Sequence, residues 1–166
     1  LTIVITELDG FETVSLIKTS VNVDDFEICD LGDFTYVPDD NFEKKLIDLG
    51  YDDVLDDYVK TINIKDVTEL IVDDLEIKDL SGIQDFSSLE TLNCSYNELI
   101  NLGDSNIISL EHLEYEKNKL TSLDVSENIS LTNLRCDDNQ LTSLDVSENI
   151  SLTSLRCNDN QLTSLD

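Results

Sequence analysis

His112 is the only histidine of the sequence, and it lies among the glutamates Glu111, Glu114 and Glu116. An imidazole beside carboxylates can transfer protons or bind a metal ion. Catalysis would also require a nucleophile, and a zinc site would require further nitrogen or sulfur ligands. The sequence supplies neither near His112, so an ordinary surface histidine is the favoured interpretation.

The four cysteines are Cys29, Cys94, Cys136 and Cys157. They form no CxxC pair and have no histidine at ligand spacing, which argues against zinc and haem. The sequence also lacks a phosphate-binding glycine loop, a GxSxG motif and an HExxH motif. We therefore expect a protein that is not an enzyme, with no cofactor, no metal and no catalytic residue.

Three pairs of adjacent aspartates invite a calcium interpretation: Asp52-Asp53, Asp56-Asp57 and Asp73-Asp74. None has the DxDxDG spacing that gathers six or more oxygens around one ion. Solvated surface is the favoured interpretation, and calcium binding by the acidic N-terminal part stays open.

The formal net charge is −27, and 22 of the 37 acidic residues precede residue 81, where six lysines oppose them. Such a surface repels nucleic-acid phosphates and anionic lipids. No stretch is long and apolar enough for a membrane span, and the opening LTIVITELDG has no basic region typical of a signal peptide. The chain starts without Met and stops inside a repeating pattern, so we expect it to be part of a longer protein.

The sequence repeats with a period of 21 residues. LTSLDVSENISLTNLRCDDNQ from Leu120 recurs as LTSLDVSENISLTSLRCNDNQ from Leu141. The same frame contains two series of equivalent residues: Leu89, Leu110, Leu131 and Leu152, and Asn97, Asn118, Asn139 and Asn160. A fifth unit, VTELIVDDLEI from Val67, fits at a spacing of 22 but has Leu75 at the asparagine position.

Each unit reads LxxLx(C/Y)xxNxL, the leucine-rich-repeat signature. A coil of this length cannot bury its own apolar edge, but stacked coils form a parallel sheet with leucines inside. The predicted fold is therefore an α/β leucine-rich-repeat solenoid, a right-handed coil with a parallel sheet on one face. On the reverse side of the coils, we expect these residues to complete the core: Leu123, Val125, Ile129, Leu144, Val146 and Ile150.

Two inward columns are expected. The asparagine column (Asn97, Asn118, Asn139, Asn160) would bond backbone groups at the bend after each strand, in its own coil and the next, because buried backbone needs partners. The cysteine column contains Cys94, Tyr115, Cys136 and Cys157. Side chains of neighbouring parallel strands project in parallel, so free thiols are favoured over a disulfide; the state of Cys29 stays open.

A helical N-terminal cap is expected at residues 34–66, between a β-hairpin segment at 1–33 and five repeats at 67–166, the last incomplete. Asp39 and Asp40 after Pro38 mark a helix start, Glu43 adds a favourable charge near it, and Gly50 ends it. The apolar stripe of this helix is Phe42, Leu46, Ile47 and Leu49. Alternation around Asp9-Gly10 predicts the hairpin, which is either the end of a preceding β domain or an edge added to the cap.

Residues 35–166 resemble bacterial leucine-rich-repeat proteins with 21- to 22-residue units, the internalin-like surface proteins. The resemblance is carried by LTSLDVSENISLTxLRC with NxL in register, and by TYVPDDNFEKKLIDLGYDDVLDDYVKTINIKDVTEL upstream. It implies a secreted or cell-surface, multi-domain bacterial protein, and therefore an extracellular location whose export signal lies outside this sequence.

The leucine frame fixes the core and leaves the outward positions of the sheet free to bind. The candidate binding residues are Tyr96, His112, Glu114, Lys117, Arg135, Asp137, Arg156 and Asn158. Tyr96, Arg135 and Arg156 are the best anchors, because aromatic and Arg side chains dominate interface energetics. The alternative is ordinary surface, with Arg135 paired to Glu114 or Asp137. The same frame places Ser95 outward.

The sequence therefore predicts a non-catalytic protein–protein interaction or adhesion module that binds a protein, not nucleic acid, and does not insert into membranes. The alternative is a structural spacer or targeting segment of a larger exported enzyme whose catalytic domain lies outside this chain. We also expect Leu162 and Leu165 to be partly exposed at the uncapped C-terminal end, and self-association through that end.

Overall fold

The computed structural model describes residues 2–8, 11–17, 33–101, 107 and 109–165, with side chains described from residue 33 onward. The chain divides into two compact units, Leu1–Leu31 and Gly32–Asp166. No helix among the described residues is long and apolar enough to cross a membrane.

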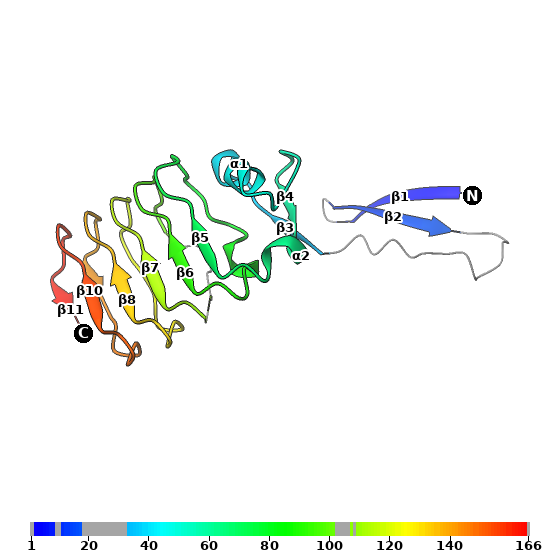
Figure 1. Ribbon diagram of the computed structural model, residues 1–166. Coiled ribbons are helices and arrows are strands. Elements are labelled where there is room, and N and C mark those ends of the chain that lie inside the picture. The colour runs from blue at the N-terminus through cyan, green and yellow to red at the C-terminus, as the bar shows by residue number, and fades with distance from the viewer. Residues whose placement is uncertain (1, 9–10, 18–32, 102–106, 108, 166) are drawn as a thin grey trace. The chain divides into compact units, whose positions relative to one another are not determined.

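The first unit contains a β-hairpin (Figure 1). Strands β1 (Thr2–Leu8) and β2 (Phe11–Ile17) are antiparallel over seven residues each. The alternation of apolar residues predicted this pairing, and the hairpin segment is confirmed. The expected Asp9-Gly10 turn and Cys29 lie outside the described residues.

The second unit begins with a cap of short elements: β3 (Phe34–Tyr36), α1 (Asp40–Asp48), β4 (Tyr58–Lys60) and α2 (Thr61–Ile64). Strands β3 and β4 are antiparallel. Helix α1 starts where the sequence predicts, because Asp39 Oδ1 accepts hydrogen bonds from the backbone N–H groups of Asn41 and Phe42 at 3.0 and 3.1 Å. Gly50, with φ +80°, follows the helix.

The buried face of α1 is shorter than predicted. Phe42 and Leu46 are fully buried, whereas Ile47 is half-buried and Leu49 is 42% exposed. Leu49 is the C-cap residue, so the chain turns away at Gly50 before that side chain is covered.

Glu43 differs more strongly from its expected role as a charge at the helix start. Its side chain is fully buried, and its Oε1 accepts hydrogen bonds from the backbone N–H groups of Asp56 (2.9 Å) and Tyr58 (3.2 Å). The carboxylate therefore holds the segment that leads into β4 against α1.

The repeats form a five-stranded parallel sheet in the order β10-β8-β7-β6-β5 (Figure 1). Its strands are β5 (Glu69–Ile71), β6 (Thr91–Asn93), β7 (His112–Glu114), β8 (Asn133–Arg135) and β10 (Ser154–Arg156). The central leucine of each strand pairs in register with the next: Leu70, Leu92, Leu113, Leu134 and Leu155. The leucine-rich-repeat solenoid predicted from the 21-residue period is confirmed.

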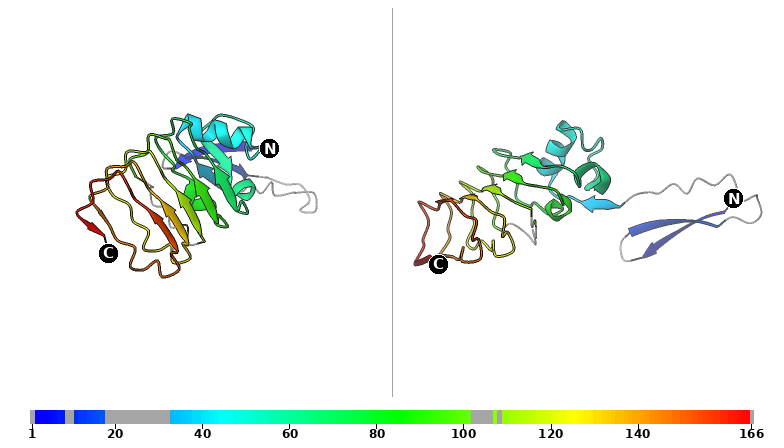
Figure 2. Two further views of the ribbon diagram at one scale, coloured as in Figure 1. Left: turned by 60° about the vertical axis from the view of Figure 1, so that its left-hand side comes forward. Right: turned by 60° about the horizontal axis from the view of Figure 1, so that its bottom comes forward.

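The coils are stacked one on another, and each returns on the side opposite the five-stranded sheet (Figure 2). This returning side carries a second, two-stranded parallel sheet, β9 (Ser143–Leu144) with β11 (Ser164–Leu165). A short 3-10 helix at Ile83–Asp85 takes the equivalent return path in the first coil. The core runs between the two sides and into the cap, where the rings of Phe42 and Phe86 stack with centroids 6.4 Å apart.

Gly82 shows how closely the first coil approaches the cap. Its φ is +98°, and a Cβ at this position would lie 2.6 Å from the carbonyl oxygen of Tyr36. Beside it, Thr35 Oγ1 donates a hydrogen bond to Asp85 Oδ2 at 2.7 Å. Only glycine fits this contact between β3 and the first coil without a backbone shift.

The reverse side departs from the prediction at two isoleucines. Leu123, Val125 and Leu144 are buried as expected and Val146 is half-buried, but Ile129 is 55% and Ile150 is 89% exposed. The expectation that these two isoleucines complete the core is wrong.

Asparagine side chains occupy the inward positions that were expected for the two isoleucines. Asn128 and Asn149, each one residue earlier, are 2% and 3% exposed. Asn128 Nδ2 donates to Ile107 O at 2.7 Å, and Asn149 Nδ2 donates to Val125 O and Asn128 O at 2.8 and 2.9 Å. Each of these carbonyl oxygens also accepts a backbone N–H, and the inward amide adds a second hydrogen bond to it, while the isoleucine side chain lies outside.

At the last coil the burial decreases. Leu155 and Leu162 are half-buried and Leu165 is 52% exposed, whereas their equivalents one coil earlier, Leu134, Leu141 and Leu144, are buried. The partial exposure expected for Leu162 and Leu165 is confirmed.

Candidate binding surface

The outward positions flank the buried leucine of each strand of the five-stranded sheet. One column contains Glu69, Thr91, His112, Asn133 and Ser154, and the next contains Ile71, Asn93, Glu114, Arg135 and Arg156. In β5 to β8 the central residue is buried and its two neighbours are half-buried or exposed. We call the outward residues of β5, β6, β7, β8 and β10, with the residues of the bend that follows each strand, the sheet face.

The two arginines of the chain are direct neighbours on this face, since Arg135 and Arg156 are register partners. Arg135 Nη1 lies 3.4 Å from Glu114 Oε1, which is the pairing that the surface interpretation expects. Arg156 is exposed and makes no ion pair with any residue that the structure describes. Arg156 is therefore the guanidinium available to a partner.

The bend after each strand has an unusual backbone. Five equivalent residues have φ between +51° and +58°: Asp74, Tyr96, Lys117, Asp138 and Asp159. Aspartate tolerates this left-handed conformation, but tyrosine and lysine adopt it less readily. Hydrogen bonds to the next coil hold them there, from Tyr96 N to Glu116 O at 2.8 Å and from Lys117 N to Asp137 O at 3.0 Å.

This backbone places Tyr96 and Lys117 together at the surface. The Lys117 ammonium nitrogen lies 4.7 Å from the centroid of the Tyr96 ring, a cation–π contact, and Tyr96 is 48% exposed. One coil further, Asp137 Oδ1 accepts hydrogen bonds from the backbone N–H and from Nδ2 of Asn158, both at 2.7 Å. These contacts fix the side chains that a partner would meet.

Ser95 is a correction to the predicted outward positions. It is only 2% exposed, and Asn93 Oδ1 accepts a hydrogen bond from its backbone N–H at 3.0 Å. At this bend the chain begins to turn inward toward Asn97, so the third outward position is partly covered.

His112 is exposed on β7 between Thr91 and Asn133 of the neighbouring strands. In the part of the chain that the structure describes, no group of three or more His, Cys, Asp or Glu residues could hold a metal ion. His112 therefore contributes to the surface as a single polar ring.

The asparagine column lies directly beneath the bend. Asn139 Oδ1 accepts a hydrogen bond from Leu120 N at 3.0 Å, and its Nδ2 donates to Tyr115 O at 2.9 Å and Cys136 O at 3.2 Å. The asparagines Asn97, Asn118 and Asn160 repeat this arrangement. Each amide thus joins its own coil to the preceding one, whereas the sequence-based expectation named the next coil.

The cysteine column packs behind the same strands. Cys94, Tyr115 and Cys136 are fully buried and Cys157 is half-buried, and the three cysteines are free thiols. Burial raises the pKa of Cys136 to about 12 and the pKa of Cys94 well above its usual value. Tyr115 interrupts the thiols, and its hydroxyl donates to Asn101 O at 2.9 Å. The column is therefore inert packing at neutral pH, except at its half-buried last member.

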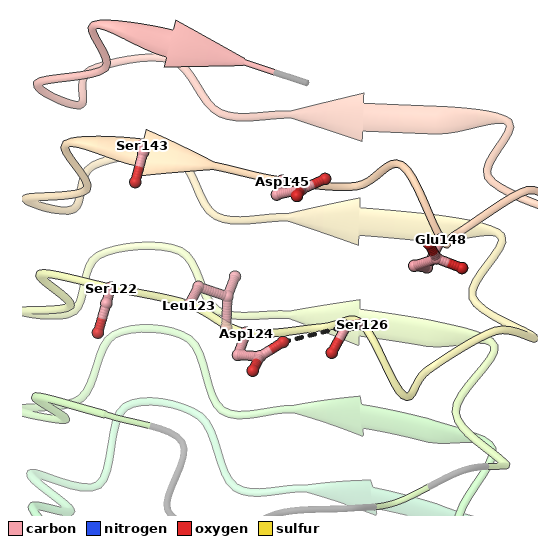
Figure 3. A pocket seen from close by; sticks show the side chains of 7 residues that line it. All are labelled: Ser122, Leu123, Asp124, Ser126, Ser143, Asp145 and Glu148. Carbon is pink, nitrogen blue, oxygen red and sulfur yellow. Dashed lines mark hydrogen bonds between the residues drawn. The ribbon is translucent and has the colours of Figure 1, made fainter.

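On the reverse side, a hollow of about 200 Å³ lies between successive coils (Figure 3). Its charged lining is Asp124, Asp145 and Glu148, accompanied by serines. The backbone N–H of Ser126 donates to Asp124 Oδ1 at 3.0 Å, and hydrogen bonds from Ser126 lower the pKa of that carboxyl. We call this the reverse hollow; the sequence reasoning missed it, although Asp124 and Asp145 recur at the 21-residue period.

Parallel sheet, leucine core and asparagine column together define a leucine-rich-repeat protein with repeats of 21 residues. No protein-family model matches the sequence, and no curated protein matches it. Solved structures match. The functional domain of InlJ from Listeria monocytogenes, described as including a cysteine ladder, is 35% identical with a TM-score of 0.74, over 81% of this chain and 31% of the InlJ chain.

Two further Listeria monocytogenes proteins share the fold. The internalin InlF is 21% identical with a TM-score of 0.59, over 76% of this chain and 45% of its own. The internalin C2, InlC2, is 19% identical with a TM-score of 0.54, over 78% of this chain and 74% of its own. This chain has the leucine-rich-repeat fold and is similar to the internalins, and it spans about a third of the InlJ chain that it matches.

Proposed function

We propose that this chain is a non-catalytic protein–protein interaction or adhesion module of a secreted or cell-surface bacterial protein, and that it binds its partner through the sheet face. The observation that carries the proposal is the pairing of a rigid frame with free outward side chains. Leucines that are buried in the inner coils and the asparagine column fix the frame, while Tyr96, Lys117 and Arg156 remain at the surface.

A preformed surface of this kind loses little conformational entropy on binding. Aromatic and Arg side chains at its centre are the groups that contribute most to interface energies. The likeness to the internalins supports the module type and the extracellular location. The partner is a protein, because the acidic chain repels nucleic acids and anionic membranes.

The test compares proteins captured by the immobilised chain with those captured by the double variant Arg135→Glu/Arg156→Glu. A matched control, Lys44→Glu/Lys78→Glu, makes the same change in charge on the cap and the first coil. We expect the sheet-face variant to lose captured proteins that the control variant retains. If all three chains captured the same proteins, Arg135 and Arg156 would not contribute to binding, and the proposal that the sheet face binds through them would be contradicted.

The alternative function, a spacer or targeting segment of an exported enzyme, is favoured by one observation. The units from Leu120 and Leu141 differ at only two of 21 positions, so their outward residues repeat instead of diversifying. A hydrolase domain in the flanking reading frame, together with unchanged capture by the charge-reversed variant, would support the spacer function over the module.

A further inference from the structure

A second hollow, of about 290 Å³, lies in the cap, away from the sheet face. Three aromatic side chains and three carboxylates line it: Phe34, Tyr51, Tyr58, Asp52, Asp53 and Asp56. We call it the cap hollow. Lys60 is the only basic residue of its lining.

The aromatic side chains reach the cap hollow from three separate segments. Phe34 lies on β3 and is 50% exposed, Tyr58 lies on β4, and Tyr51 follows the end of α1. The ring of Tyr58 packs against Tyr36 with centroids 5.4 Å apart, which fixes its position. An acidic loop that serves only as solvated surface does not require aromatic rings, because exposing their apolar surface to water costs free energy.

The carboxylates stand on a loop that the fold holds in place. Glu43 accepts hydrogen bonds from the backbone N–H groups of Asp56 and Tyr58, and Asp56 Oδ1 accepts a further one from Tyr58 N at 3.1 Å. Asp52 Oδ2 is closed off from solvent and has no hydrogen-bond partner among the described residues. Asp52 nevertheless belongs to the lining of the hollow.

We propose that the cap hollow binds an alkylammonium group, either a free alkylamine or the side chain of a lysine on another protein. Aromatic faces attract cations, carboxylates accept their N–H groups, and the alkyl stem packs on the rings. Three carboxylates against one lysine exclude anions and make a neutral apolar ligand unfavourable. The three carboxylates do not form a metal site, because no group of three or more His, Cys, Asp or Glu among the described residues could hold a metal ion.

The reverse hollow is a built-in control for this inference. It also presents three carboxylates, Asp124, Asp145 and Glu148, but none of its lining residues is aromatic (Figure 3). If acidic charge alone attracted amines, the two hollows would bind them alike. The inference requires that only the cap hollow does so.

The experiment is a titration of the ¹⁵N-labelled chain, followed by amide chemical shifts at low salt and neutral pH. The probes are n-butylamine, for a free amine, and Nα-acetyl-lysine N-methylamide, for a lysine on a protein. Nα-acetyl-norleucine N-methylamide is the uncharged control probe. We expect saturable shifts at Phe34 and at residues 51–60 with the amines and none with norleucine; the tighter amine identifies the source.

Variants complete the test. Asp52→Asn should weaken amine binding about tenfold, the effect of losing one charge-assisted hydrogen bond. Phe34→Ala should weaken it as well, and Asp53→Asn serves in its place if that variant loses its dispersed spectrum. Asp124→Asn, in the reverse hollow, should leave it unchanged. Absence of shifts with both amines, equal shifts with norleucine, or an equal loss in Asp124→Asn would overturn the proposal.

Discussion

Single replacements in the asparagine column should destabilise the protein in an order set by the backbone groups that each amide serves alone. Replacement of Asn97 should reduce the free energy of unfolding the most. Its Oδ1 accepts hydrogen bonds from Leu75 N (3.1 Å) and Ile77 N (3.0 Å), and its Nδ2 donates to Val72 O at 2.7 Å. None of these three groups has another partner among the described residues.

Replacement of Asn139 leaves fewer backbone groups without a hydrogen-bond partner. In Asn139→Ala, Leu120 N loses its partner, but Tyr115 O keeps the amide of Asn118 at 3.3 Å and Cys136 O keeps that of Asn160 at 2.9 Å. Stranding one buried polar group costs about 1–3 kcal/mol. We therefore expect a loss of about 2 kcal/mol for Asn139→Ala and about 3 kcal/mol or more for Asn97→Ala.

Asn160→Ala should cost about 1 kcal/mol or less, because Asn160 is half-buried and water can replace its bonds. The assay is urea unfolding followed by circular dichroism at 25 °C, with the free energy of unfolding taken at constant slope. Asn158→Ala is the control, since Asn158 is exposed on the sheet face and should shift the free energy by less than about 0.5 kcal/mol. Equal losses for Asn97→Ala and Asn160→Ala would refute the reasoning.

Five further outcomes are expected. Leu134→Ala should cost about 2–5 kcal/mol in the same unfolding assay, because it opens a cavity in a fully buried column. Gly82→Ala should cost more than about 1 kcal/mol, since its Cβ would meet Tyr36 O at 2.6 Å at a φ of +98°. In a thiol-labelling assay at pH 8, Cys157 should react in the folded chain and Cys136 only on unfolding. The folded pKa of Cys136, about 12, exceeds the unfolded value of 9.0, so its contribution to stability should be complete below pH 9 and be lost as the pH rises toward 12; Cys136→Ala should flatten that decline in the urea midpoint. Sedimentation velocity should show self-association that grows with concentration, because the last coil exposes core positions; a single monomer peak at all concentrations would count against it.

The sheet could be predicted from the sequence because only one arrangement of the chain buries the leucines that recur every 21 residues. Leu92, Leu113 and Leu134 recur in phase, and stacked coils are the arrangement that buries all three at once. Helix α1 was predictable for a local reason, since Asp39 and Gly50 mark its two ends.

The reverse side could not be predicted from hydrophobicity alone. Ile129 and Asn128 are adjacent, and the apolar residue was the natural choice for the core. The deciding factor is that the amide of Asn128 finds an acceptor inside the coil, the carbonyl of Ile107, which also accepts the backbone N–H of Leu110. The recurrence of asparagine at 128 and 149 was the available signal, of the same kind that indicated the asparagine column.

The outward residues of the sheet face could be placed by register, but their contacts could not. The 3.4 Å contact of Arg135 with Glu114, and the exposure of Arg156, depend on how long side chains settle on neighbouring strands. The cap hollow lies further beyond sequence reasoning, because its lining comes from β3, the end of α1 and β4, which no sequence period relates.

The two proposed sites use different elements of the second unit, so their tests are independent. The sheet face is built by the repeats, whose backbone is fixed by the asparagine column; the cap hollow is built by β3, β4 and the loop that Glu43 holds. Asp52→Asn should therefore leave capture through Arg156 unchanged, and Arg156→Glu should leave amine binding unchanged. If each variant lost both protein capture and amine binding, both sets of residues would contact one ligand. The cap would then be part of the binding surface of the repeats.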